Sequence, residues 1–206
     1  MNDEAGFWDK RAEKYARRPV ADQETYNKKL EITRTYFQID SEVLEIGCGT
    51  GSTALAHAPY VKHILATDIS PAMIKIARDK AEAGQIDNVS FEIQAVAGHD
   101  IQESCYDVIL AHNLLHLLED PQAAITAAYR GLKPGGVFIT STACIADMAW
   151  YFRIIVPVGH FLGLIPLVRV FTQAQLIQSF IDAGFIIDHE WLPKKNAAAF
   201  IIAKKS

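Results

Sequence analysis

VLEIGCGTG, residues 43–51, joins a short apolar run to a loop with glycines at alternate positions. The run before the loop predicts a strand, and Gly47, Gly49 and Gly51 let the backbone turn sharply and come close to a ligand. A glycine loop that follows the first strand of an alternating strand–helix pattern is the usual place for a nucleotide. The stretch therefore predicts a nucleotide-binding α/β fold.

The rest of the chain alternates in the same way. The expected strands are EVLEIG (42–47), HILATD (63–68), VSFEI (89–93), YDVILAH (106–112), VFITST (137–142), GFIIDHEW (184–191) and NAAAFIIAK (196–204). The expected helices are a segment capped by Asp22 with Tyr26, Leu30, Thr33 and Phe37 on one face, then TALAHA (53–58), SPAMIKIARDKAEAG (70–84), DPQAAITAAYRGL (120–132) and a last helix that begins with the capping box TQAQ (172–175). KPGG (133–136) is expected to be a turn.

This pattern predicts a mostly parallel sheet with helices on both faces, closed by an antiparallel pair of strands. The chain of 206 residues, half of them hydrophobic, suits one domain over 1–206. Within it we expect an N-terminal helical cap over 1–38 and an apolar insert over 143–171. Ligands of such sheets bind outside the carboxyl ends of the strands.

Two carboxylates indicate the class of ligand. Glu45, two residues ahead of Gly47, would repel a pyrophosphate but would suit an ammonium and a sulfonium group. Ser52 also stands where the dinucleotide fingerprint has glycine or alanine. Asp68 ends the second strand, at a site we expect to be exposed, and can accept hydrogen bonds from both ribose hydroxyls. Ile69 follows it and can pack on an adenine.

Four segments, VLEIGCGTG, ATDIS (66–70), YDVILAHNLLHLLEDP (106–121) and GLKPGGVFI (131–139), resemble the class I S-adenosylmethionine-dependent methyltransferases in order and spacing. They are most similar to the group that includes the ubiquinone and menaquinone methyltransferases. The resemblance implies a Rossmann-like sheet of seven strands with the last one antiparallel, and S-adenosylmethionine as the cofactor.

The resemblance also implies a set of cofactor-binding residues. These are Tyr15, Glu45, Gly47, Cys48, Gly49, Gly51, Asp68, Ile69, Ala95, Val96 and His112. Tyr15 would reach the cofactor's carboxylate from a leading helix that carries Phe7, Trp8 and Ala12 on the same face. The family usually has an acidic residue for the adenine amino group near Ala95, and Gln94 or a backbone group would have to replace it here.

Two histidines follow the fourth strand. His112 and His116 lie four residues apart and are the candidate catalytic bases, although local packing and hydrogen bonding explain them better. They lack the third ligand that a zinc site needs, so no metal is expected. Methyl transfer from a sulfonium depends chiefly on alignment of donor and acceptor, and a base helps only if the acceptor must lose a proton.

An uncharged run over 154–168, between Arg153 and Arg169, is shorter than the ~20 residues that a spanning helix needs. The resemblance places it on the substrate side of the sheet. It is either a lid that closes the core, a pocket for a small or lipid-like acceptor, or a peripheral membrane contact through 150–171.

Charge and cysteine usage exclude other classes. The net charge is −4 without a basic block, so a nucleic-acid partner is not expected. The polar, acidic start lacks the layout of a signal peptide, and Cys48, Cys105 and Cys144 form no CxxC pair. A cytoplasmic methyltransferase is the favoured interpretation. A nicotinamide-dependent oxidoreductase and a non-catalytic S-adenosylmethionine-binding protein stay open as alternatives.

Overall fold

The computed structural model describes residues 4–96, 101–148, 151–161, 165–194 and 196–206. The strands are β1 (Glu42–Ile46), β2 (His63–Asp68), β3 (Val89–Ile93), β4 (Tyr106–His112), β5 (Leu132–Thr142), β6 (Phe185–Trp191) and β7 (Ala199–Lys205). The α-helices are α1 (Glu4–Asp9), α2 (Ala12–Arg17), α3 (Gln23–Arg34), α4 (Ser52–His57), α5 (Pro71–Ala83), α6 (Pro121–Gly131), α7 (Phe152–Phe161) and α8 (Gln173–Asp182). Short 3-10 helices include η1 (Ala58–Tyr60), η3 (Leu115–Leu117) and η4 (Ile145–Asp147).

The strands form a seven-stranded sheet in the order β3-β2-β1-β4-β5-β7-β6. β1 runs parallel to β2 and β4, and β2 runs parallel to β3. β7 is antiparallel to both of its neighbours, β5 and β6. The predicted Rossmann-like sheet with an antiparallel last strand is therefore confirmed.

The chain divides into two compact units, and each is described by itself. Unit 1 comprises the described residues of Met1–His99 and Cys105–Leu110, and unit 2 those of Asp100–Ser104 and Ala111–Ser206. Unit 1 thus holds the glycine loop, and unit 2 holds both candidate histidines.

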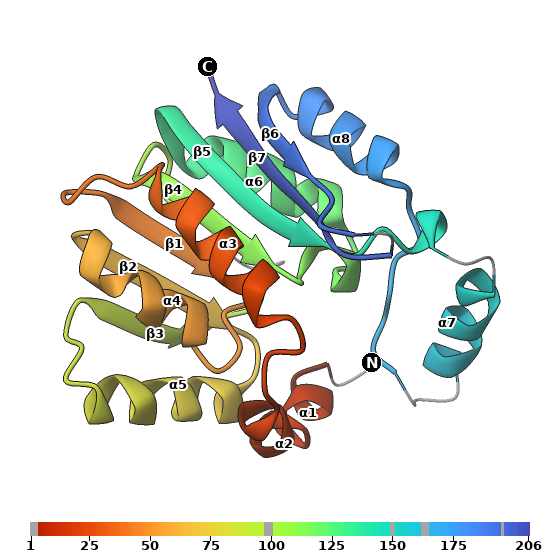
Figure 1. Ribbon diagram of the computed structural model, residues 1–206, viewed down its shortest axis with the longest axis horizontal. Helices are drawn as coiled ribbons and strands as arrows, with labels where there is room; N and C mark the ends of the chain where they lie inside the picture. Colours follow the sequence, from red (N-terminus) through yellow and green to blue (C-terminus); the bar gives the residue numbers. More distant parts are fainter. Residues whose placement is uncertain (1–3, 97–100, 149–150, 162–164, 195) are drawn as a thin grey trace. The chain divides into compact units, whose positions relative to one another are not determined.

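In unit 1, helices α3, α4 and α5 cover one face of β1, β2 and β3 (Figure 1). The helix starts follow the sequence rules. Asp22 Oδ1 accepts a hydrogen bond from the Thr25 N–H, and Ser70 Oγ accepts one from the Met73 N–H ahead of Pro71. The predicted caps of α3 and α5 are therefore confirmed, and the start of α5 lies directly after Asp68.

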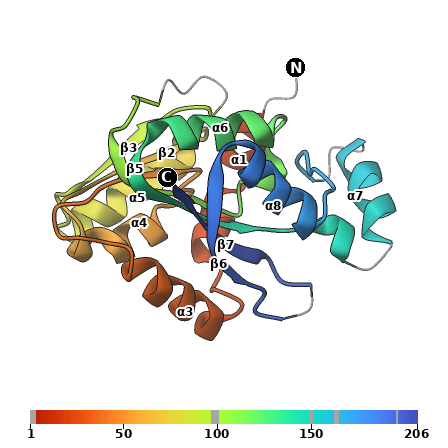
Figure 2. The same ribbon diagram turned by 90° about the horizontal axis from the view of Figure 1, so that it is seen from above.

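In unit 2, α6 and α8 pack against β5 and β6 through aromatic rings. Phe138 of β5 lies against Phe180 of α8 and Phe185 of β6, with ring centroids 5.7 and 6.0 Å apart. Tyr129 of α6 meets Phe185 edge to face at 5.0 Å. Figure 2 shows α6 and α8 beside these strands. Thr172 and Gln175 form the predicted capping box of α8.

Two expected elements differ from the observed ones. The leading helix is broken into α1 and α2, and the break leaves Asp9 at the end of α1, where it contacts the start of α5. KPGG belongs to β5, although Gly135 adopts φ +78° and so still bends the chain there. Of the described helices, none is long and apolar enough to cross a membrane.

Candidate functional site

The glycine loop of unit 1 leaves β1 at Ile46 and enters α4 at Ser52. Gly47, Gly49 and Gly51 have φ values of +68°, +54° and +74°, which is the left-handed region that other residues rarely adopt. The Cys48 N–H donates to the Thr67 carbonyl at 2.9 Å, so the loop is tied to β2. Backbone conformation therefore explains the three alternate glycines that the sequence shows.

Glu45 lies beneath this loop and is only 2% exposed. Its Oε2 atom has no hydrogen-bond partner among the described residues. Burial, and then the neighbouring Asp68 carboxylate, raise the pKa of Glu45 to about 8, while a backbone hydrogen bond from Ala54 acts in the opposite direction. A buried carboxyl oxygen without a hydrogen-bond partner costs free energy unless a ligand donates a hydrogen bond to it, and an ammonium group would do so.

Asp68 connects the end of β2 to the loop. Its Oδ2 accepts a hydrogen bond from the Gly49 N–H at 2.8 Å, and its Oδ1 accepts one from the Ser70 N–H at 2.9 Å. The Ile69 N–H is a further backbone donor to this carboxylate. A carboxylate offers about four acceptor positions, so acceptor capacity remains for a ribose hydroxyl. The side chain is half-buried rather than exposed, which corrects our expectation of an exposed strand end: Asp68 also holds the loop.

The segment that we predict to contact the adenine follows β3. The Gln94 N–H donates to the Asp68 carbonyl at 2.9 Å, so this segment lies beside Asp68, the residue predicted to hold the ribose. Ile69 and Val96 are half-buried and Ala95 is exposed. Their contact with an adenine stays a prediction.

Tyr15 of α2 lies over the glycine loop. A Cβ atom on Gly49 would be 3.8 Å from Tyr15 Cε1. The phenol is half-exposed, and partial burial together with the Asp68 charge raises the pKa of Tyr15. The structure therefore brings Tyr15, Glu45, Gly49 and Asp68 together within unit 1.

Asp9 is a residue of this region that the sequence analysis missed. Its Oδ1 accepts hydrogen bonds from Ser70 Oγ at 2.5 Å and from the Ala72 N–H at 3.0 Å. It thereby ties α1 to the start of α5, next to Asp68. No local sequence pattern predicts this contact, because the partners lie about sixty positions apart in the chain.

The two histidines of unit 2 differ in environment. Burial lowers the pKa of His116 to about 4, and its Nδ1 atom has no hydrogen-bond partner among the described residues. His112 is half-buried at the end of β4, and its ring stacks on Phe200 at a centroid distance of 6.5 Å. His116 is therefore poorly suited to accept a proton near neutral pH, whereas His112 keeps a partly accessible ring.

Phe200 is the centre of an aromatic cluster in unit 2. Beside His112, the rings of His189 and Trp191 lie 6.2 and 6.3 Å from it, both nearly perpendicular to its plane. The sequence analysis did not single out these residues, because β6 and β7 come together only through their antiparallel pairing.

Comparisons with known proteins show the family of the chain. The family model described as "Methyltransferase domain" matches residues 39–179. A ubiquinone biosynthesis O-methyltransferase from Idiomarina loihiensis is 34% identical over 127 residues, which cover 61% of this chain and 51% of that protein. A ribosomal protein L11 methyltransferase from Staphylococcus haemolyticus is 31% identical over 125 residues, which cover 59% and 38%. The chain thus spans about half or less of the length of these relatives.

A solved structure shares the fold. Phosphoethanolamine N-methyltransferase 2 from Haemonchus contortus, in complex with S-adenosyl-L-methionine, superposes with a TM-score of 0.73 at 15% identity. The match covers 87% of this chain and 52% of that chain. The names of the three proteins indicate different acceptors, so similarity alone does not identify the acceptor here.

Proposed function

The chain belongs to this family of methyltransferase domains, and we propose that it transfers the methyl group of S-adenosylmethionine to an acceptor with an apolar body. The unpartnered carboxyl oxygen of buried Glu45 is the observation that supports the cofactor most directly. It lies below a glycine loop and beside Asp68, whose carboxylate keeps acceptor capacity for a ribose hydroxyl. Together they suit a nucleoside that carries a cation and no phosphate.

S-adenosylmethionine supplies a methyl group that is already activated by a positive sulfur. The residues of the chain therefore have to bind the cofactor, orient the acceptor toward its methyl group and exclude water. Glu45 would neutralise the amino group, Asp68 would accept both ribose hydroxyls, and Tyr15 would reach the carboxylate. Ile69 and Val96 would cover the adenine.

Titration calorimetry tests the cofactor class. S-adenosylhomocysteine should bind, and NAD should bind weakly or not at all, because a pyrophosphate would bring negative charge beside the Asp68 carboxylate and would supply no cation for the buried Glu45 carboxyl. The opposite order of affinities would favour the nicotinamide-dependent oxidoreductase. Tight S-adenosylhomocysteine binding without transfer to any acceptor would favour a non-catalytic binding protein.

If the acceptor must lose a proton, we assign the base to His112 rather than His116. Burial lowers the pKa of His116 to about 4, so that ring would hold a proton only weakly. His112 is half-buried and lies at the end of β4. His112→Gln should lower kcat, and His116→Gln should change kcat much less. Equal loss in both variants would contradict the assignment.

Helix α7 of unit 2 supports the proposal that the acceptor has an apolar body. Ile155 and Val158 are 57% and 51% exposed, and Tyr151, just before the helix, is also exposed on this face. Trp150 lies outside the described residues. An apolar acceptor body would cover this surface and gain roughly 25 cal/mol per Å2 of apolar area removed from water.

The test is a series of quinone-precursor or lipid acceptors that differ only in tail length. Activity of the wild type should rise with tail length, and Ile155→Ser combined with Val158→Ser should flatten the rise. Ile186→Ser is the matched control, because Ile186 is an exposed isoleucine of unit 2 on β6. A wild-type activity that ignores tail length would identify α7 as a structural lid.

The same face of α7 would also hold the protein at a membrane surface that carries the acceptor. Co-sedimentation with anionic phospholipid vesicles tests this part of the proposal. The wild type should sediment and the double serine variant should not. If both stay in the supernatant, the acceptor reaches the enzyme from solution.

A further inference from the structure

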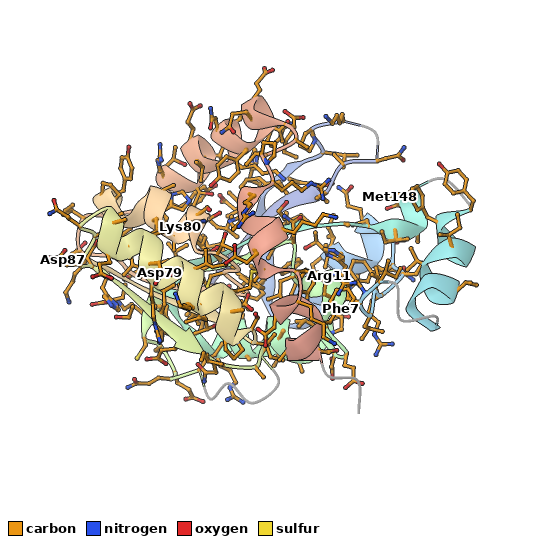
Figure 3. All side chains as sticks on the ribbon, turned by 90° about the horizontal axis from the view of Figure 1, so that it is seen from below. Phe7, Arg11, Asp79, Lys80, Asp87 and Met148 are labelled. Atoms are coloured by element: carbon orange, nitrogen blue, oxygen red, sulfur yellow. The ribbon has the colours of Figure 1, made fainter. Side chains whose placement is uncertain are left out.

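The ammonium group of Lys80 points at the glycine loop. Lys80 Nζ, near the C-terminal end of α5, lies 3.0 Å from each of three atoms: the Thr50 carbonyl oxygen, Thr50 Oγ1 and Ser52 Oγ. An ammonium has three N–H donors, so these three acceptors satisfy it. Figure 3 shows Lys80 on the side of α5 that is nearer to α4.

These partners are uncharged, which is unusual for a surface lysine. On the same helix, Lys75 forms an exposed ion pair with Asp79 at 2.7 Å. Lys80 is instead half-buried, and burial lowers the pKa of its ammonium. Because an ammonium normally stays in water, this placement indicates that its hydrogen bonds to the loop have a role.

The loop needs support from outside its own backbone. Its three left-handed glycines leave it without the repeating hydrogen bonds of a helix or strand. Gly51 lies so close to α5 and β3 that a Cβ atom there would be 2.8 Å from Ala77 Cβ and 2.8 Å from Phe91 Cε1. Ala77 and Lys80 are three residues apart, so they share one face of α5. This face therefore holds the loop at two points, by packing at Gly51 and by hydrogen bonds at Thr50 and Ser52.

We propose that Lys80 is a positioning residue, which holds residues 49–52 in the conformation that binds the cofactor. This inference rests on the proposed function, because the loop conformation affects activity only if the loop binds the cofactor. A loop that is ordered before binding loses less conformational entropy when the ligand arrives, so affinity rises. Lys80 acts through the loop and touches no reacting atom.

Three variants test the proposal. Lys80→Met removes the ammonium and keeps most of the stem, and Lys80→Arg restores N–H donors. Lys75→Met is the matched control, because it removes an exposed lysine from the same helix. Calorimetry with S-adenosylhomocysteine should give a Kd about tenfold higher for Lys80→Met, which is the lower end for loss of hydrogen bonds to a charged group. Lys75→Met should bind like the wild type, and Lys80→Arg should recover part of the loss.

Hydrogen exchange without ligand separates this proposal from the proposed function. Amides of residues 47–52 should exchange faster in Lys80→Met, while those of β2 stay unchanged. If the wild type fails to bind S-adenosylhomocysteine, the proposed function is wrong, and faster loop exchange would still show that Lys80 holds the loop. Wild-type affinity in Lys80→Met overturns the positioning role, whatever the exchange shows. Unchanged loop exchange overturns it as well.

Discussion

The carboxyl group of Glu45 is buried in the protein. Its neighbours in β1 are apolar, the Asp68 carboxylate is close, and one oxygen has no partner among the described residues. Because water cannot solvate the charged form there, the pKa rises to about 8. The ligand-free protein is therefore expected to hold Glu45 largely protonated at pH 7.

Glu45→Gln should stabilise the ligand-free protein more at high pH than at low pH. Between a normal pKa of 4.5 and the folded value of about 8, the folded state binds more protons than the unfolded state. In the wild type this group therefore lowers stability as pH rises through that window, and glutamine removes the effect. From about pH 5.5 to about pH 8.5, the stability of Glu45→Gln relative to wild type should rise by up to about 3 kcal/mol, at about 1.4 kcal/mol per pKa unit.

Urea unfolding at both pH values measures this difference. Glu92→Gln, at an exposed position of β3, is the control and should show no comparable pH-dependent gain. A pH-independent effect of Glu45→Gln would mean that Glu45 is charged in the folded protein.

Asp68→Ala should weaken S-adenosylhomocysteine binding by about 1.5–3 kcal/mol, the range for hydrogen bonds to a charged group. Because Asp68 also accepts the Gly49 and Ser70 N–H groups, we expect a loss of roughly 1–2 kcal/mol in unfolding free energy as well. Calorimetry and urea unfolding measure the two effects, with Asp79→Ala as an exposed acidic control on α5. A folded Asp68→Ala protein with wild-type affinity would remove Asp68 from the site.

At the scale of elements, the loop, α5 and β3 are packed too closely for a side chain at Gly51. Gly51→Ala adds a methyl group 2.8 Å from Ala77 Cβ at a residue with φ +74°. Overpacking costs about 1–3 kcal/mol, and the left-handed conformation adds roughly 1–2 kcal/mol. The variant should lose both stability and cofactor affinity.

Gly135→Ala is the matched control for this prediction. Gly135 has a similar φ of +78°, but a Cβ atom there would meet nothing within 4 Å. Thermal unfolding should therefore show only the backbone cost of roughly 1–2 kcal/mol. Equal losses in the two variants would mean that close packing around Gly51 contributes nothing.

At the scale of the whole molecule, the side chains that we propose to bind the cofactor belong to unit 1, except for His112, which belongs to unit 2. The protection of backbone amides from hydrogen exchange on cofactor binding should therefore be greatest in unit 1. With S-adenosylhomocysteine bound, the rapidly exchanging amides of the glycine loop and of residues 68–70 should become protected. Those of the β6–β7 pair should change little, and protection of equal size there would contradict a cofactor site built mainly on unit 1.

The sequence by itself determined most of the elements and the order in which they occur. Caps at Asp22, Ser70 and Thr172 act within one helical turn, so they can be predicted from neighbouring residues. The glycine loop and the carboxylates near it could also be predicted from the sequence, because the pattern that identifies them depends on short spacing. The exceptions were the broken leading helix, the extent of β5, and helix α7, which the sequence analysis described only as part of an apolar insert.

Only the tertiary structure decided which residues, distant in the sequence, contact one another around the glycine loop. It buried Glu45, joined Asp9 to Ser70 and placed Lys80 on Thr50, across 61 and 30 positions of sequence. It also separated the two histidines by environment, since burial lowers the pKa of His116 to about 4. Burial and long-range hydrogen bonds depend on how elements pack, and no local pattern in the chain carries that information.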